Sequence, residues 1–315
     1  MSTRTRSLRG ARWVRAALAT IAFGSVAAHA APAQADQEKT VQWNENWPRV
    51  HLVEVGAIVA LTIGSIELSL VKPPDHAKWT GGILFDDGAR KLFRSDSAKT
   101  QEFAAVWSDN LYHGMVLAPY IIDNYIVALG VHQNADVALQ MTLINLQSLG
   151  LSGVISLGAE RTVGRARPYT AECSGPNRAD KVGFNHCDGV GEFEDFYSGH
   201  AAAAFTMAGL TCVHHQHLPL YGGGLPDAMA CIVMTSLATT TGIMRLVADR
   251  HYASDVLLGT AIGVLNGYVL PSWLHYGFGD SRKGVSTVMK TSYGYVAPVP
   301  QVYKGGGGLG LAGVF

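Results

Sequence analysis

The sequence has few charged residues and no excess of either sign. Lysine plus arginine and aspartate plus glutamate each number 24 in 315 residues, and charged residues make up 15% of the chain against 48% hydrophobic residues. A balanced charge gives no basic field for duplex nucleic acid, so we expect no nucleic-acid partner. A chain this apolar is typical of a helical protein in or beside a membrane.

A recognisable metal-binding pattern is also missing. His214, His215 and His217 stand close together, but adjacent histidines cannot easily face one ion, and no acidic or cysteine partner follows at a fixed offset. We therefore predict no metal site.

Cysteine is scarce, with four residues in the chain. Cys173 and Cys187 lie in one polar loop, and in an exported protein a bridge between them would close a loop of about fifteen residues. Cys212 and Cys231 lie near the facing ends of two successive apolar segments. That pair either forms a second bridge or remains as two buried thiols.

The N-terminus has the pattern of an export signal. Several arginines precede a short apolar stretch from Ala16 to Ala28, and Ala28-His29-Ala30 fits a small-x-small cleavage site. No two arginines are adjacent in this region, so the sequence does not indicate the twin-arginine route, which exports folded proteins. We expect residues 1–30 to be a signal peptide, with an uncleaved signal anchor as the alternative, and residues 31–50 to be a linker.

Long apolar segments fill most of the remaining chain. They span residues 51–71, 111–131, 137–159, 201–213, 228–244 and 256–274. Their length and composition predict an all-α bundle of about six core helices over residues 51–275, either soluble or embedded in a membrane. Residues 276–315 form a glycine-rich tail, for which we expect an edge hairpin or a disordered segment.

A cation, an imidazole and a carboxylate stand at fixed intervals between the last two apolar segments. Arg245 precedes His251 by six residues, and Asp255 follows His251 by four. If a helix starts near Asp255, its carboxylate can accept from one imidazole nitrogen and leave the other free as a nucleophile or general base. The alternative is a helix-capping aspartate beside an ordinary loop histidine.

Two further polar clusters stand at the ends of apolar segments. Arg161, Arg165 and Arg167 follow the third segment, and Ser198-Gly199-His200 precedes the fourth. A helix start of this kind offers free amides to an anion. In an up-and-down bundle these ends and the Arg245–Asp255 stretch fall on one rim, so we expect them to form a single anion-binding site.

The order of these motifs resembles the type 2 phosphatidic acid phosphatase superfamily, which includes class A acid phosphatases and vanadium haloperoxidases. The resemblance covers about residues 137–274. The first family motif, Lys-x6-Arg-Pro, is similar to the present chain only at its end, residues 163–168. Pro-Ser-Gly-His appears as residues 197–200, and Ser-Arg-x5-His-x3-Asp appears as residues 244–255.

Three positions depart from the family motifs. Glu160 stands where the family has its first-motif lysine, which removes one phosphate contact unless Arg161 or Arg165 replaces it. Tyr197 replaces proline and Met244 replaces serine, and neither lost side chain carries the chemistry.

The resemblance implies a phosphatase that needs no metal or other cofactor and acts on a phosphate monoester or diphosphate, either a lipid phosphate or polyprenyl diphosphate. It implies that His251 attacks phosphorus, that Asp255 holds its other nitrogen, and that His200 protonates the leaving oxygen. It also implies that Arg167, Arg245, Ser198 and Gly199 bind the phosphate oxygens.

Two alternatives remain for the activity. The first is a vanadate-dependent haloperoxidase, because the same pocket would bind vanadate. The second is a non-catalytic family member that binds phosphorylated lipid without turnover, because Glu160 replaces the first-motif lysine.

The side of the membrane depends on how many segments cross it. Six spanning helices after a cleaved signal would place the rim in the cytoplasm. A first segment that does not span, because Glu54 and Glu67 interrupt it, would return the rim to the periplasm. We expect an exported envelope protein with its site on the periplasmic side of the inner membrane, or in the soluble periplasm.

Overall fold

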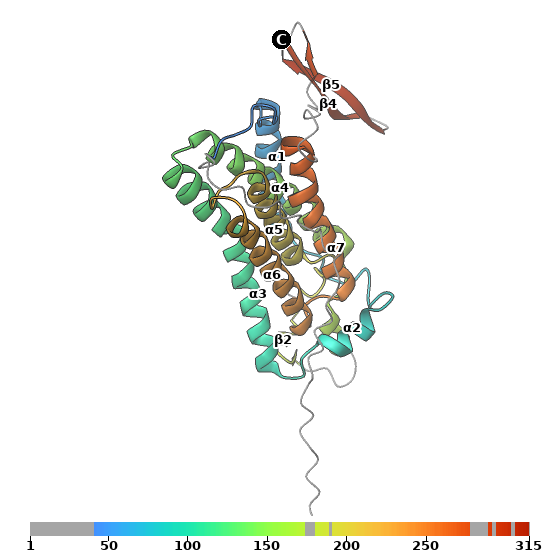
Figure 1. Ribbon diagram of the computed structural model, residues 1–315. Helices are drawn as coiled ribbons and strands as arrows, with labels where there is room; N and C mark the ends of the chain where they lie inside the picture. Colours follow the sequence, from blue (N-terminus) through green and yellow to red (C-terminus); the bar gives the residue numbers. More distant parts are fainter. Residues whose placement is uncertain are drawn as a thin grey trace, which may run out of the picture. The chain divides into compact units, whose positions relative to one another are not determined.

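Six long helices, two of them continued by wider helical turns, form the body of the protein (Figure 1). The computed structural model describes residues 41–173, 180–188, 191–277, 289–291, 294–303 and 306–314. The expected signal peptide, 1–30, and the first half of the expected linker, 31–50, lie outside the described residues. The long helices are α1 (Leu52–Leu70), α3 (Ala98–Pro119) continued by η1 (Tyr120–Val131), α4 (Ala135–Val163), α5 (Gly199–His217), α6 (Leu225–Val247), and α7 (Ala253–Val264) continued by η3 (Leu265–Val269) and η4 (Ser272–Tyr276).

This architecture confirms the predicted all-α bundle of about six helices. The helices extend beyond the apolar runs from which they were predicted, most of all α3, which begins at Ala98 rather than near Leu111. Ser97 caps that start by accepting a hydrogen bond from the backbone of Thr100. The amphipathic turns before Leu111 are polar enough to hide a helix start from an apolar-run criterion.

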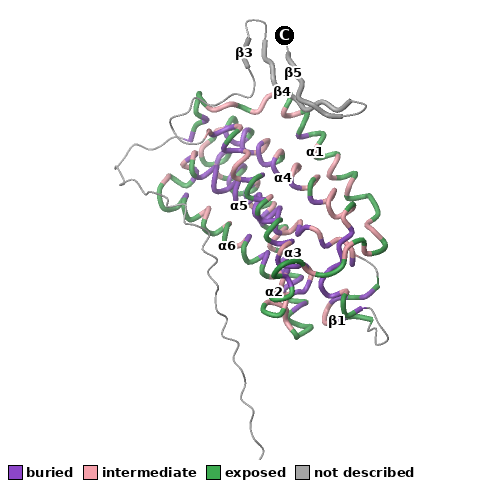
Figure 2. The backbone as a smooth tube through the Cα atoms, turned by 90° about the vertical axis from the view of Figure 1, so that its right-hand side faces the viewer, coloured by how far each residue is buried: buried purple, intermediate pink, exposed green. Residues whose placement is uncertain are grey.

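Helix α5 forms the centre of the bundle. Every residue from Ala201 to His215 is buried, and Figure 2 shows this helix as a largely buried segment among more exposed ones. Its first turns are four successive alanines, Ala201 to Ala204, which let neighbouring helices approach closely on several sides. Helices α3, α4, α6 and α7 all pack against it.

Glycines on α7 allow especially close contact with α5. A Cβ atom at Gly259 would lie 2.5 Å from the carbonyl oxygen of Ser198, and one at Gly263 would lie 2.5 Å from that of Ala202. Only a residue without a side chain fits at these distances. The backbone amide of Ser198 then reaches the carbonyl of Asp255 at 3.2 Å. The close approach fixes the start of α7 beside the start of α5.

The outer helices carry large apolar side chains on their exposed faces. Among the residues that the structure describes, five helices are long and apolar enough by length and composition to cross a membrane: residues 52–70, 98–131, 135–163, 225–247 and 253–276. Ile63 on α1, Ile126 on η1 and Ile232 on α6 are each at least half exposed. Side chains of this kind are stable on an outer surface that faces lipid. The chain is therefore a membrane protein.

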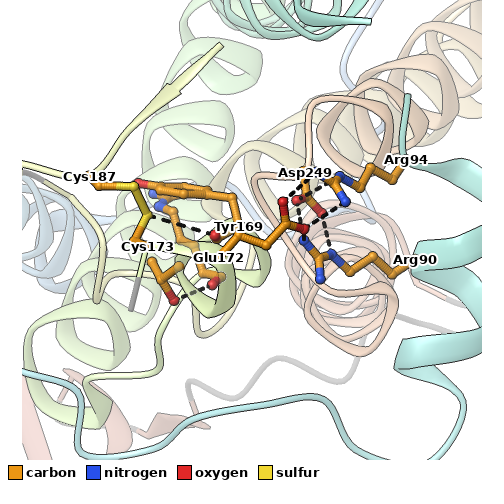
Figure 3. Close-up of a disulfide and its surroundings, with 9 residues drawn as sticks. Arg90, Arg94, Tyr169, Glu172, Cys173, Cys187 and Asp249 are labelled. Atoms are coloured by element: carbon orange, nitrogen blue, oxygen red, sulfur yellow. Dashed lines mark hydrogen bonds and ion pairs between the residues drawn. A yellow bond between two sulfur atoms is a disulfide. The ribbon is translucent and has the colours of Figure 1, made fainter. Parts of the chain in front are cut away.

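Shorter elements cover the rim where the predicted motifs lie. They are α2 (Asp86–Phe93), η2 (Pro168–Glu172) and a two-stranded antiparallel hairpin, β1 (Lys181–Val182) with β2 (Asn185–His186). A disulfide between Cys173 and Cys187 joins η2 to the end of the hairpin. Figure 3 shows this disulfide beside an ion-pair network in which Arg90 and Arg94 contact Asp249 and Glu172. The network ties α2 to the loop after α6.

The C-terminal tail contains a three-stranded antiparallel sheet in the order β3 (Met289–Thr291), β4 (Gly294–Tyr303) and β5 (Gly306–Val314). We expected a hairpin or a disordered segment, and the structure adds a third strand to the hairpin. The alternation of Leu309 and Leu311 with glycine favours extended pairing over a helix.

Candidate active site

The ends of four helices meet on one rim, as the motif order predicted. Helix α4 ends at Val163, α5 begins at Gly199, α6 ends at Val247 and α7 begins at Ala253. Gly164 ends α4 in the left-handed conformation, with φ of 66°, and turns the chain toward the site.

His251 lies in the short loop between α6 and α7 and is 4% exposed. Its Nδ1 atom lies 2.9 Å from the backbone oxygen of Asp195 and 2.9 Å from a carboxylate oxygen of the same residue. Its Nε2 atom lies 3.4 Å from a guanidinium nitrogen of Arg167. Burial, with the nearby Arg167 cation, lowers the pKa of His251 well below its usual range. The imidazole is therefore neutral at neutral pH.

Asp255 does not occupy the position that the sequence suggested. Its carboxylate accepts from Arg165 at 2.7 Å and from the backbone amide of Tyr252 at 3.3 Å, which caps α7. The residue beside Nδ1 of His251 is instead Asp195, which the motifs did not indicate. Burial, with the Asp255 carboxylate close by, raises the pKa of Asp195 well above its usual value. The expected direct pairing of His251 with Asp255 is thus replaced by a buried group of all three residues.

The third residue of α7 is a capping position, which explains this difference. A carboxylate there turns back toward the amides of its own helix start. Asp195, Asp255 and His251 still lie together. One carboxylate oxygen from each aspartate and one ring nitrogen of His251 all lie within 4.8 Å of one another. Arg165 supplies the cation that balances this acidic pair.

Two of the expected phosphate-binding arginines stand on the rim and are nearly buried. Arg167 donates to the carbonyl oxygens of Gly191 at 2.5 Å and Arg250 at 2.9 Å. Arg245 donates to Ser108 at 3.2 Å and to Asp109 at 2.8 Å. These contacts hold both guanidinium groups in fixed positions around His251.

Asp109 on α3 is a site residue that the sequence analysis missed. One of its carboxylate oxygens lies 2.9 Å from Nε2 of His200 and 2.8 Å from Arg245. The carboxylate thus bridges the expected acid and an expected phosphate ligand. Asp109 lies just before the predicted apolar segment, which began at Leu111, and it belongs to none of the motifs. The sequence therefore offered only a single aspartate near a helix as a signal.

His200 stands in the first turn of α5, where its side chain is partly covered. Burial, with the Arg245 cation nearby, lowers the pKa of His200 to about 4. The substrate-free site therefore holds a neutral His200. A bound dianion would reverse this electrostatic balance, because it adds negative charge beside the imidazole.

Ser198 and Gly199 form the helix start that the sequence predicted. The Ser198 hydroxyl accepts from the backbone amide of Ala201 at 3.4 Å, which makes it the N-cap of α5. Gly199 fits a confined place, since a Cβ atom there would lie 2.7 Å from the hydroxyl of Ser156 and 3.0 Å from the carboxylate of Glu160.

Arg161 and Arg165 are engaged elsewhere. Arg161 pairs with Glu194 and donates to the carbonyl of Leu68 at 3.3 Å. Arg165 is fully buried, contacts Asp86 at 2.9 Å as well as Asp255, and stacks between two aromatic rings at 4.2 Å from each ring centre. Arg165 thus organises the start of α7 from behind. Both guanidinium groups are thus paired with other residues, and neither takes the place of the first-motif lysine.

The three histidines near the end of α5 contact neighbouring side chains. His214 contacts Asn145 and Tyr276, His215 contacts Asp227, and His217 stacks on the Tyr276 ring. Nearby, Cys212 and Cys231 form a disulfide, which selects the first of the two alternatives for that pair.

Comparison with known proteins identifies the class of this site. The family model described as the PAP2 superfamily matches residues 142–278. The match spans the end of α4, the start of α5 and the loop that carries His251. It confirms the resemblance drawn from the three motifs.

Two individual proteins are similar to parts of the chain. A lipid A 1-phosphatase of Porphyromonas gingivalis is 43% identical over 70 residues, which are 22% of this chain and 14% of that protein. The chain therefore spans a small part of that relative's length. A solved phosphatidylglycerolphosphate phosphatase of PAP2 type from Bacillus subtilis is 16% identical, with a TM-score of 0.39 over 70% of this chain and 94% of that chain.

Proposed function

We propose that the protein is a metal-independent phosphatase that removes phosphate from a phosphorylated lipid. The observation that carries this proposal is the position of Nε2 of His251, which lies 3.4 Å from the Arg167 guanidinium while its Nδ1 is held by Asp195. A neutral imidazole with one nitrogen fixed and the other beside a cation suits attack on a phosphate held by that cation.

The reaction would proceed in two steps. Nε2 of His251 forms a bond to phosphorus, the bond from phosphorus to the ester oxygen breaks, and His200 gives its proton to that oxygen. A water molecule then attacks phosphorus, His200 takes one of its protons, and the phosphorus–nitrogen bond breaks to release inorganic phosphate. The enzyme returns to its starting state, so no metal or redox partner enters the balance.

Fixed cations would stabilise the phosphoryl group during both steps. Arg167 and Arg245 are held by neighbouring oxygen atoms. Charge spreads over the equatorial oxygens of a transferring phosphoryl group, and cations placed there lower the barrier. Ser198 and Gly199 would add a hydroxyl and an amide from the start of α5.

We expect the purified protein to release phosphate from a long-chain phosphate ester in detergent micelles containing EDTA. Tungstate should inhibit competitively, because it is a phosphate-shaped dianion that fits between the same arginines. The measurement is colorimetric phosphate release against a panel of lipid monoesters, lipid diphosphates and soluble esters. Activity that disappears in EDTA and returns with added metal would refute the metal-independent mechanism.

We also propose that the catalytic rim faces the periplasm. The disulfide between Cys173 and Cys187 closes the loop beside the site, and such bridges persist in oxidising compartments. Since α1 is itself long and apolar enough to span, its single crossing would place its N-terminal end on the opposite, cytoplasmic side. A signal cleaved before residue 31 does not fit this orientation, whereas an uncleaved N-terminus does.

Single cysteines can test this orientation. Asp96 is exposed in the loop before α3 on the rim, and Glu45 is exposed before α1 at the other end. We expect a membrane-impermeant maleimide to label Asp96→Cys in cells with an intact inner membrane and to leave Glu45→Cys unlabelled until lysis. The reverse pattern would place the site in the cytoplasm. The wild-type chain is the blank, since its four cysteines are bridged.

A further inference from the structure

A groove of about 400 Å³ leads away from the candidate active site along α4. Gly199 and His200 line its end at the site, and Leu146 and Leu149 line its apolar end. Between them, small residues of α4 such as Gly153 and Ser156 leave the space open, and α1 forms the facing wall with Ile66. The groove is therefore polar where it meets the site and apolar farther away.

Glu160 lies in this groove at its polar end. It lines the groove together with Gly199 and His200, and its carboxylate would lie 3.0 Å from a Cβ atom built on Gly199. Its hydrogen bond from Ser156 is long, at 3.5 Å. A carboxylate with such a weak partner retains capacity to accept from a ligand. An acidic side chain thus occupies the position next to the reacting phosphate.

We propose that Glu160 selects the substrate by the group next to its phosphate. This inference rests on the proposed phosphatase function and assigns its substrate class: a lipid phosphomonoester whose head group carries a hydroxyl or an ammonium close to the ester oxygen. Such a donor would bond to the carboxylate while the chain follows the apolar groove. A diphosphate would bring its second phosphate toward the same carboxylate and be repelled.

The physical basis is the difference between a ligand group that donates a hydrogen bond to Glu160 and a ligand group that brings a second negative charge toward it. A hydrogen bond to a carboxylate is about twice as strong as one between neutral groups. Specificity also needs an element that rejects the wrong ligand, and two anions in a partly dry groove provide it. Arg161, the next residue, pairs with Glu194 and makes no ion pair with Glu160 in the described part of the chain.

The experiment compares two matched substrate pairs in detergent micelles. The first pair is a 1-acylglycerol 3-phosphate and the same molecule without its free hydroxyl. The second pair is a prenyl monophosphate and the diphosphate of the same chain. Each is assayed with wild type, Glu160→Gln, Glu160→Lys and the control Glu67→Lys, which makes the same charge change at an exposed position of α1 outside the groove.

For wild type and the control we expect kcat/KM to favour the hydroxyl-bearing lipid over its deoxy analogue by about 10- to 100-fold. Glu160→Lys should remove that preference and raise the diphosphate-to-monophosphate ratio by at least about tenfold, and Glu160→Gln should change both ratios in the same directions by less. Ratios equal to those of wild type in both active Glu160 variants would overturn this inference and leave the phosphatase function standing. No phosphate release by wild type from any substrate would overturn the phosphatase function, and this inference with it.

Discussion

Replacement of His251 by alanine is expected to lower kcat for phosphate release by about 10,000-fold or more, because the variant lacks the atom that bonds to phosphorus. The side chain is 4% exposed, and its nearest polar partners have other contacts: Asp195 with Arg165, and Arg167 with the Arg250 carbonyl. Substrate should therefore still bind, and KM or the inhibition constant for tungstate should change far less than kcat.

The matched control is His76→Ala, which removes an exposed histidine that pairs with Asp75 outside the motifs and should leave the rate unchanged. Detergent-solubilised variants should elute in the same position on size-exclusion chromatography. A His251→Ala rate within tenfold of wild type would contradict the nucleophilic role.

Replacement of His200 by asparagine should lower the rate on an alkyl phosphate by about 100- to 10,000-fold, the usual contribution of a general acid. The loss should be much smaller, about tenfold or less, on an aryl phosphate such as p-nitrophenyl phosphate, because its leaving oxygen needs no proton. The measurement is the ratio of kcat values for the two esters. An equal loss on both would show that His200 does not act as the acid.

The pH dependence of anion binding provides a second readout of the same residue. Burial and Arg245 hold the pKa of His200 at about 4 in the free site, so the imidazole is neutral between pH 6 and 8. A bound dianion favours the protonated form, and binding then takes up a proton. Tungstate affinity should therefore rise as pH falls from 8 to 6, by up to about tenfold per pH unit, and His200→Asn should lose this slope.

The sequence predicted the assembly of the site better than its contacts. Helix ends alternate between the two ends of an up-and-down bundle, so the order of motifs placed His200, Arg245 and His251 on one rim without any knowledge of packing. Arg167 followed from its place after the end of α4. These positions depend on chain direction and helix count, which apolar periodicity reports well.

The partners of these residues depend on side-chain direction, which periodicity does not report. Asp255 turned to cap its own helix, so Asp195 from a preceding loop took the place beside His251. Asp109 entered from α3, whose polar first turns carry no motif. Arg165, in the middle of an arginine cluster, pairs with Asp255 and with Asp86, which is remote in sequence. Contacts of this kind require the folded structure.

The most direct test of the central claim, that His251 carries the phosphoryl group, is to trap the intermediate. The enzyme is mixed with a substrate that carries radioactive phosphate, stopped within milliseconds in alkaline detergent, and digested for peptide mass spectrometry. We expect label on the peptide that contains His251, stable in alkali and lost in acid, and no label in His251→Ala. Steady release of phosphate without any label on His251 would show that His251 does not carry the phosphoryl group.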